Sequence, residues 1–343
     1  MFQIIDLFCG IGGFSYGFEM TGKFKTVLGV DLWDTALDTF KRNHPKTTTL
    51  NKKIEELDSD YWRKYESQID VIIAGPPCQG FSMAGKRDVL DERNNLFKQV
   101  VRVASIIKPK IVVIENVVGL LSMRNEFEKS IKDEILRDFE QLGYKIDYQV
   151  LNAAEFGVPQ ARKRVIFIAS NKSQVKFPHP THRFDQFVTV GDALGNITND
   201  EYYLEPQTDY QRIMSGEKRA YNHEIIKHSS LVTERMSTVP IGGNWMNIPK
   251  GLGQGGGVHS NNYKRLDPNK PSITIKHVSK SMIIHPYYDR TPTVREVARL
   301  QSFNDNFVLL GSKYDQHQQL ANAVPPLLGR GIAHVVIELL EEK

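Results

Sequence analysis

The stretch that decides the fold is residues 71–82, with the sequence VIIAGPPCQGFS. Its four apolar residues predict a short buried strand. The two prolines then end the strand, because a proline fixes φ and has no backbone N–H to pair. Cys78, one of only two cysteines in the chain, follows them and precedes a charged stretch at 84–95. A thiol presented in this way is a candidate nucleophile for an enclosed substrate. A lone cysteine is otherwise most often a small buried hydrophobe, so the other motifs decide between the two interpretations.

A glycine-rich segment near the N-terminus forms a second candidate site. Residues 3–8 predict a first strand, and residues 9–14, CGIGGF, predict the turn into a helix. Glycines at such a turn let the backbone approach a ligand at the helix N-terminus. A dinucleotide fingerprint requires glycine at position 15, which is Ser15 here. The loop alone is therefore a weak signal of a nucleotide site.

Two acidic residues follow predicted buried strands. Asp31 ends the strand predicted at 26–30, where a carboxylate can accept hydrogen bonds from ribose hydroxyls and Leu32 can pack on an adenine. Glu115 ends the strand predicted at 110–114, and a carboxylate there is costly unless it has a function. Either acid alone is equally explained as a cap of the following helix or turn. Open α/β sheets bind ligands at the carboxyl ends of their strands, which favours the functional interpretation.

The remaining pattern predicts a doubly wound, mostly parallel α/β sheet with an inserted, loop-rich small domain. Helices are expected at 96–107, 125–142, 293–303 and 327–340, and further strands at 144–151, 164–169 and 266–275. Three cations in residues 160–164, QARKR, are either solvated or placed to hold phosphates or a substrate base.

The charge distribution points to a polyanion. Residues 171–290 contain 15 lysines and arginines against 11 acids, which accounts for the whole net charge of +4. Proline, histidine and glycine are frequent in this segment, so long loops are expected at 241–245 and 251–257. A basic, aromatic-containing segment of this kind favours a nucleic-acid surface. We expect no metal site, because no cysteine or histidine spacing in it suits one.

Composition limits the class of protein. The chain has 343 residues, 40% hydrophobic and 24% charged, which is ordinary for a soluble protein of two domains. No apolar stretch is expected to span a bilayer. Two cysteines give no disulfide framework, and a free catalytic thiol suits a reducing cytosol.

These motifs resemble those of the cytosine-C5 DNA methyltransferases over residues 6–328, apart from the central segment. The resemblance implies the S-adenosylmethionine-dependent methyltransferase fold, with 1–178 and 290–343 as the catalytic and cofactor-binding domain. It makes 179–289 the target recognition domain. It also implies double-stranded DNA as substrate, S-adenosylmethionine as methyl donor and S-adenosylhomocysteine as product.

The resemblance assigns residues as follows. Its catalytic positions fall on Cys78, Glu115, Arg162 and Arg164. Its cofactor positions fall on Phe8, Gly10, Ile11, Gly12, Gly13, Asp31, Leu32, Ile54, Pro77, Leu96, Asn322, Ala323 and Val324. DNA contacts are expected from Gln79, Ser82, Lys86, Arg87, Arg93, Asn244 and Trp245. The sequence departs from the family pattern at Lys53, where an acid is usual and Glu55 or a backbone carbonyl would substitute, and at Ala321, where glycine is common.

The chemistry implied is addition of the Cys78 thiolate to carbon 6 of a flipped-out cytosine, which makes carbon 5 nucleophilic. Glu115 would relieve the charge at ring nitrogen 3, and Arg162 would stabilise the base. The Arg-Glu pairs of 293–303 are expected to organise a hinge rather than to do chemistry.

Three alternatives remain open. The same chemistry on a transfer RNA fits less well, because that branch of the family has a shorter central segment. A catalytically silent DNA-binding homologue would be expected to lack the cysteine or the glycines. A nicotinamide-dependent oxidoreductase is disfavoured by Ser15. We expect a monomeric, cytoplasmic bacterial enzyme associated with the nucleoid through DNA, with a partner restriction endonuclease and no membrane attachment.

Overall fold

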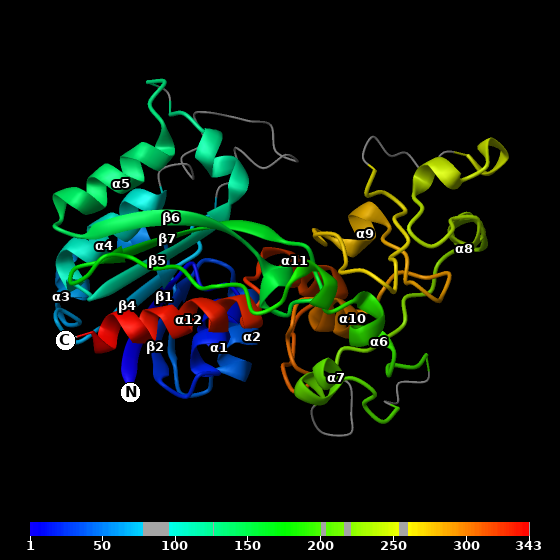
Figure 1. Ribbon diagram of the computed structural model, residues 1–343, viewed down its shortest axis with the longest axis horizontal. Helices are drawn as coiled ribbons and strands as arrows, with labels where there is room; N and C mark the ends of the chain where they lie inside the picture. Colours follow the sequence, from blue (N-terminus) through cyan, green and yellow to red (C-terminus); the bar gives the residue numbers. More distant parts are fainter. Residues whose placement is uncertain (78–95, 126, 200–203, 216–220, 254–259, 343) are drawn as a thin grey trace. The chain divides into compact units, whose positions relative to one another are not determined.

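The computed structural model of the chain describes residues 1–77, 96–125, 127–199, 204–215, 221–253 and 260–342 (Figure 1). The chain divides into two compact units. Unit 1 contains Met1–Asn152, Lys163–His179 and Pro326–Lys343; unit 2 contains Ala153–Arg162 and Pro180–Pro325. Residues 180–289 of the predicted recognition segment lie in unit 2, which also takes in residues on both sides of that segment.

Unit 1 is built on one sheet, whose described strands number seven and follow the order β3-β2-β1-β4-β5-β7-β6. The first five strands of the chain run parallel, and β7 pairs antiparallel with both β5 and β6. This confirms the predicted mostly parallel, doubly wound sheet. The strands are β1 Phe2–Leu7, β2 Phe24–Asp31, β3 Thr48–Asn51, β4 Val71–Ala74, β5 Ile111–Val117, β6 Lys145–Asn152 and β7 Lys163–Ser170.

Helices cover both faces of this sheet (Figure 1). One face is covered by α3 (Ser59–Arg63), α4 (Leu96–Ile107) and α5 (Ile131–Gln141), whose buried apolar side chains pack on those of the strands. The other face carries α1 (Gly13–Glu19), α2 (Asp34–Asn43) and α12 (Pro326–Glu341).

The helices α1 and α12 approach each other closely at Gly17. A Cβ there would lie 2.3 Å from the carbonyl oxygen of Pro326, so only glycine permits this packing. The C-terminal helix predicted at 327–340 is confirmed by α12, and the helix predicted at 96–107 by α4.

The stretch Lys313–Glu341 is long and apolar enough to cross a membrane by length and composition, contrary to the expectation from the sequence. It contains two helices, α11 (Lys313–Asn322) and α12, and 72% of its most apolar window is buried inside the protein. Such burial is that of a core helix in a globular protein.

Two predicted elements differ from the structure. The helix predicted at 125–142 begins only at Ile131, because the side chain of Ser130 accepts the Asp133 N–H and caps it there. The strand predicted at 266–275 is absent from the described residues, where only single bridges join Arg265 to Ile284 and Gln160 to Ser272. Two prolines in that stretch remove the backbone donors that a continuous ladder needs.

Unit 2 consists of short helices joined by long loops. Its helices are α6 Val190–Leu194, α7 Asp209–Met214, α8 Ser230–Ser237, α9 Val278–Ser281, α10 Val294–Leu300 and α11 Lys313–Asn322. A small apolar cluster that includes Met236, Tyr263 and Ile284 is buried in it, with Trp245 packed against the cluster. The predicted capped helix at 293–303 is α10, which Thr293 and Glu296 cap reciprocally.

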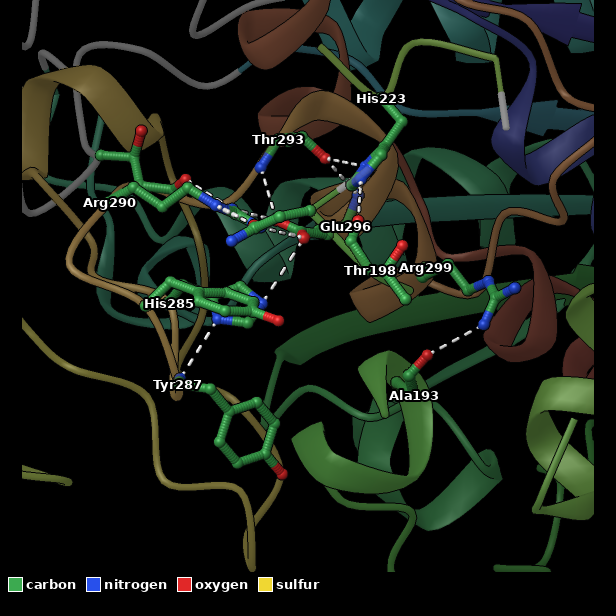
Figure 2. Close-up of polar contacts among 12 residues, drawn as sticks. Ala193, Thr198, His223, His285, Tyr287, Arg290, Thr293, Glu296 and Arg299 are labelled. Atoms are coloured by element: carbon green, nitrogen blue, oxygen red, sulfur yellow. Dashed lines mark hydrogen bonds and ion pairs between the residues drawn. The ribbon is translucent and has the colours of Figure 1, made fainter. Parts of the chain in front are cut away.

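Buried ion pairs hold the interior of unit 2 together (Figure 2). Glu296 is fully buried. Its carboxylate accepts hydrogen bonds from both terminal nitrogens of Arg290, each at 2.8 Å, and from the backbone N–H of Thr293 at 2.7 Å. His285 Nε2 lies 3.5 Å from the same carboxylate. These donors hold the pKa of Glu296 well below its usual range, in spite of burial. The charged residues of α10 therefore serve packing inside unit 2.

Candidate active site

The candidate site lies at the carboxyl edge of the sheet in unit 1. There β1 and β2 end at or just before the predicted residues Phe8 and Asp31, β4 ends three residues before Pro77, and Glu115 lies two residues before the end of β5. Because these strands are parallel, their ends share one edge of the sheet. The fold thus brings the predicted cofactor acid and the predicted catalytic acid to the same side of unit 1.

The glycine loop after β1 is held by Asp31. The backbone N–H of Gly10 donates to Asp31 Oδ2 at 2.8 Å, and that of Trp33 donates to Oδ1 at 2.9 Å. Burial raises the pKa of Asp31 above its ordinary value. Phe8 has φ +60°, Gly10 +52° and Gly12 +84°, so this loop turns through left-handed conformations that favour glycine.

The two central glycines of the loop have different roles. A Cβ on Gly10 would meet nothing within 4 Å, whereas one on Gly12 would lie 2.5 Å from His44 Nε2. Gly10 therefore leaves an open face above the sheet edge, and Gly12 lets α1 pack against α2. Open space at Gly10 is what a ligand at this loop requires.

A buried acid supports the loop from below. The hydroxyl of Ser15 donates to Asp6 Oδ2 at 2.6 Å, and Asp6 is 1% exposed. Burial raises the pKa of Asp6 to about 8. Ser15 thus has a partner that explains its presence where a dinucleotide fingerprint has glycine. An acidic residue in the first strand and a hydroxyl residue in the helix after it are the features of the sequence that could have indicated this contact.

The other predicted cofactor residues of unit 1 differ in exposure. Leu32 is 56% exposed next to Asp31, which leaves its side chain available to a planar ring. Ile11 and Ile54 are buried, and Pro77 and Leu96 are half-buried. The remaining predicted cofactor residues, Asn322, Ala323 and Val324, belong to unit 2.

Arg102 is a supporting residue that the sequence did not reveal. Its guanidinium donates to the carbonyls of Ile54, at 2.7 Å, and Leu57, at 3.0 Å. These bonds fix the short turn where the family pattern has an acid and this chain has Lys53. Lys53 and Glu55 are both exposed. The contact comes from α4, 48 residues further along the chain, and no local pattern marks it.

The predicted catalytic acid is paired with an arginine on the neighbouring strand. Arg164 Nε lies 2.8 Å from Glu115 Oε1, and both side chains are nearly buried, at 13% and 10% exposure. The pairing follows from the antiparallel register of β5 and β7, in which Val117 faces Arg164. Glu115 Oε2 is also 3.8 Å from the position of a Cβ on Gly75. The carboxylate thus sits beside the turn that leads to Pro76 and Pro77.

Arg162, the other predicted catalytic arginine, lies in unit 2 and is 2% exposed. Its Nη2 donates to the carbonyls of Ala321 and Ala323, each at 3.0 Å. The guanidinium therefore anchors the end of α11, which carries the predicted cofactor residues of that unit.

Several predicted residues lie outside the described part of the chain. They are Cys78, Gln79, Ser82, Lys86, Arg87 and Arg93. The other cysteine, Cys9, is buried in the loop after β1, where its thiol lies 3.9 Å from the carbonyl oxygen of Gly10. Burial raises the pKa of the Cys9 thiol well above its ordinary value, which disfavours a thiolate at this position.

The predicted DNA-contacting residues of unit 2 are partly used in its own packing. The side chain of Asn244 accepts the backbone N–H of Met246 at 3.0 Å, and Trp245 packs on the small apolar cluster. Ile241 and Met246 beside them are 56% and 66% exposed. Among the described residues, no group of three or more His, Cys, Asp or Glu side chains is placed to hold a metal ion.

The fold and this edge define the class of protein. A solved structure assigned to a DNA modification methyltransferase of an E. coli prophage matches the whole chain over its own full length, with TM-score 0.80 and 26% identity. A methyltransferase from Entamoeba histolytica shares the fold, with TM-score 0.68 and 17% identity over the whole of this chain. The architecture is that of the methyltransferases.

The family follows from the sequence comparisons. The family model described as C-5 cytosine-specific DNA methylase matches residues 2–338, and the chain belongs to this family. The chain is 40% identical over 343 residues to the type II methyltransferase M1.HphI of Haemophilus parahaemolyticus, covering 98% of this chain and 86% of that protein. It is 35% identical over 365 residues to M.DdeI of Desulfomicrobium norvegicum, covering 96% and 87%. The protein is a DNA (cytosine-5-)-methyltransferase of the type II restriction-modification kind.

Proposed function

We propose that the enzyme transfers a methyl group from S-adenosylmethionine to carbon 5 of a cytosine flipped out of double-stranded DNA, through a temporary bond to Cys78. The observation that carries the proposal is the Glu115–Arg164 pair, 2.8 Å apart, beside the Gly75 turn. A nearly buried carboxylate and guanidinium at a sheet edge, beside a glycine that precedes Cys78 by three residues in the sequence, suit recognition and activation of a polar ring.

The pair has separate tasks during the reaction. Carbon 5 of cytosine is a poor nucleophile until a thiolate adds at carbon 6. Glu115 would hold a proton or hydrogen bond at ring nitrogen 3, so that the negative charge pushed into the ring is relieved. Arg164 would keep the carboxylate in place and stabilise charge on the base. We propose that Arg162, whose Nη2 donates to the carbonyls of Ala321 and Ala323, contributes less to the reaction than Arg164.

The residues of the glycine loop fit the methyl donor. Gly10 has open space above it, Leu32 offers an exposed apolar surface for the adenine, and Asp31 offers a carboxylate beside it. S-adenosylmethionine supplies an electrophilic methyl group on a sulfonium, and S-adenosylhomocysteine remains afterwards. Loss of the carbon 5 hydrogen as a proton to a base, with breaking of the bond between Cys78 and carbon 6, would then restore the ring and free the thiolate. Gly10, Asp31 and Leu32 would bind and orient the methyl donor.

DNA would be gripped by the charged segment after Cys78 and read by the predicted recognition domain at 179–289. Flipping a cytosine costs a few kcal/mol, which phosphate contacts by Lys86, Arg87 and Arg93 would offset. Asn244 and Trp245 remain proposed DNA-binding residues. Since similar chains are type II methyltransferases, we propose that this enzyme protects the DNA of a bacterial cytoplasm from a partner restriction endonuclease, acting as a monomer.

Bisulfite sequencing of DNA from cells that express the protein tests the proposal. We expect one cytosine in a single short sequence to resist conversion by bisulfite. No cytosine should resist conversion with the Cys78→Ala variant at equal protein level. Absence of protected cytosines, or protection that survives Cys78→Ala, contradicts the proposal.

A further inference from the structure

The strand β4 loses its backbone partner on β5 just before the catalytic segment. Pairing between the two strands runs from Val71 and Ile111 to Ala74 and Ile114 and stops there. On the other side, the backbone N–H of Gly75 still donates to Leu7 at 3.2 Å. Pro76 and Pro77 have no N–H, so the ladder with β5 has no donors to continue. The chain therefore needs another attachment at this point if its exit is to be fixed.

A side chain of β5 supplies that attachment. Asn116 is 5% exposed, and its Nδ2 donates to the carbonyl of Pro76 at 3.0 Å in a buried bond. Its Oδ1 accepts the backbone N–H of Val117 at 2.8 Å. Both polar atoms of the amide are thus engaged, and the side chain is held in one orientation. The Asn116 amide thus donates to the backbone just after β4, as a backbone N–H does in the paired part of the two strands.

The same two residues of β5 control both sides of the turn. The carboxylate of Glu115 lies beside Gly75, and the amide of Asn116 holds Pro76. Glu115 and Asn116 are consecutive in β5, so this strand fixes the position of the Pro76 carbonyl relative to the Glu115 carboxylate. Proline stiffness carries this constraint forward, because Pro77 has a fixed φ.

We propose that Asn116 is a positioning residue, which fixes the Pro76 carbonyl and thereby the placement of the Cys78 thiol relative to Glu115. The inference rests on the proposed function. A displacement of about 1 Å at reacting atoms costs roughly 10²-fold in rate. Loss of the Asn116 bond is therefore expected to slow covalent addition while substrate and donor still bind.

The experiment measures single-turnover formation of the covalent adduct with duplex DNA that contains 5-fluorocytosine at the target found by bisulfite sequencing. DNA and S-adenosylmethionine are saturating, and the dissociation constant of each is measured separately. The variants are Asn116→Ala and Asn116→Ser; serine is too short to reach Pro76 but keeps a hydroxyl near the Val117 N–H. We expect adduct formation about 10²-fold slower in both, with both dissociation constants within about threefold of wild type.

Asn171→Ala is the matched control. It removes another bond from an asparagine amide to a proline carbonyl in unit 1, that from Asn171 to Pro109 at 3.4 Å, near the opposite end of β5. We expect its adduct rate to equal that of wild type.

Three outcomes overturn the inference: an unchanged adduct rate in Asn116→Ala, full recovery in Asn116→Ser, or a loss explained by weaker DNA or donor binding. Failure of the proposed function is distinguishable, because the wild-type enzyme would then form no adduct at all.

Discussion

Two buried carboxylates in this molecule have opposite surroundings. Glu296 in unit 2 is fully enclosed and receives two nitrogens of Arg290, the Thr293 N–H and a nearby imidazole. Glu115 in unit 1 lies at the end of a strand, 8% exposed, with Arg164 on one side and the Gly75 turn on the other. Both are paired with arginine, so the pairing itself does not separate structure from chemistry.

The two carboxylates differ in the hydrogen-bond donors that surround them. The donors around Glu296 hold its pKa well below the ordinary value and keep it ionised. Such a carboxylate has no means of exchanging a proton near neutral pH. Glu115 sits where open α/β sheets bind ligands, beside Gly75, which precedes Cys78 by three residues in the sequence. We infer that a buried acid with saturated donors stabilises the fold, whereas one at the sheet edge acts on a substrate.

Glu115→Gln gives the largest expected effect and tests one half of this comparison. Glutamine keeps the shape but holds no exchangeable acid proton, so we expect methyl transfer to fall by about 10²–10⁴-fold. The melting temperature should fall less than after the same change at Glu296, because the Arg164–Glu115 pair is partly exposed, at 13% and 10%. Transfer of labelled methyl groups to target DNA measures the rate, and turnover above a tenth of wild type would contradict the role of Glu115.

Glu296→Gln tests the other half. Removing one partner of a buried ion pair leaves Arg290 uncompensated, and we expect a loss of about 3–5 kcal/mol in the free energy of unfolding. Denaturant titration measures it, with Glu115→Gln as the matched variant, in which a smaller loss is expected. Methyl transfer per folded molecule should stay near wild type at low temperature; a selective loss of turnover with full stability would break the comparison.

Asp6 is a third buried acid, and it accepts a hydrogen bond from the Ser15 hydroxyl. Its pKa is raised from 3.8 to about 8, so the folded state binds its proton more tightly than the unfolded state. The stabilisation is complete below pH 3.8 and is lost as the pH rises through about 8, at up to roughly 1.4 kcal/mol per pH unit. Asp6→Asn should flatten the melting temperature between pH 5 and 8.5. An unaltered slope in that variant would show that Asp6 is ionised throughout.

His317 shows the opposite sign. It is 2% exposed in α11, and burial, with His277 and Lys313 nearby, lowers its pKa from 6.5 to about 4. Its contribution is present above pH 6.5 and is lost as the pH falls toward 4, at up to roughly 1.4 kcal/mol per pH unit. His317→Gln should reduce the acid sensitivity of unfolding in this window. Identical acid titrations of the two proteins would contradict burial of a neutral ring.

The smallest expected effect separates the two arginines. Arg162→Lys breaks hydrogen bonds to the Ala321 and Ala323 carbonyls, and we expect a loss of about 1 kcal/mol in stability with turnover within a few-fold of wild type. Arg164→Lys should instead lower turnover by more than tenfold, because it disturbs Glu115. Single-turnover rates under saturating conditions decide, and equal losses in both variants would remove the distinction.

The parts of this fold that the sequence predicted are those with a local signal. The apolar run at 71–74 with its two prolines and the glycine loop appear at the expected places, and the strand predicted at 110–114 is present but continues through Glu115 to Val117. Each depends on periodicity or on the backbone chemistry of glycine and proline, which act over a few residues.

The parts that it did not predict depend on distant partners. Arg162 and Arg164 are two residues apart and chemically identical, yet one meets α11 and the other β5. The bonds from Arg102 to Ile54 and from Asn116 to Pro76 span 48 and 40 residues. The prolines of 266–275 prevented a strand that the apolar pattern had favoured. Tertiary contacts, which the sequence does not show, thus determine which partner each of these side chains has.

The most direct test of the account is the chemical identity of the covalent adduct. The enzyme is incubated with S-adenosylmethionine and target DNA containing 5-fluorocytosine, and the trapped complex is digested and mapped by mass spectrometry. We expect one modified peptide, in which Cys78 is bonded to the pyrimidine and carbon 5 of the pyrimidine carries a methyl group. An adduct on any other residue, or complete methyl transfer without an adduct, would contradict it.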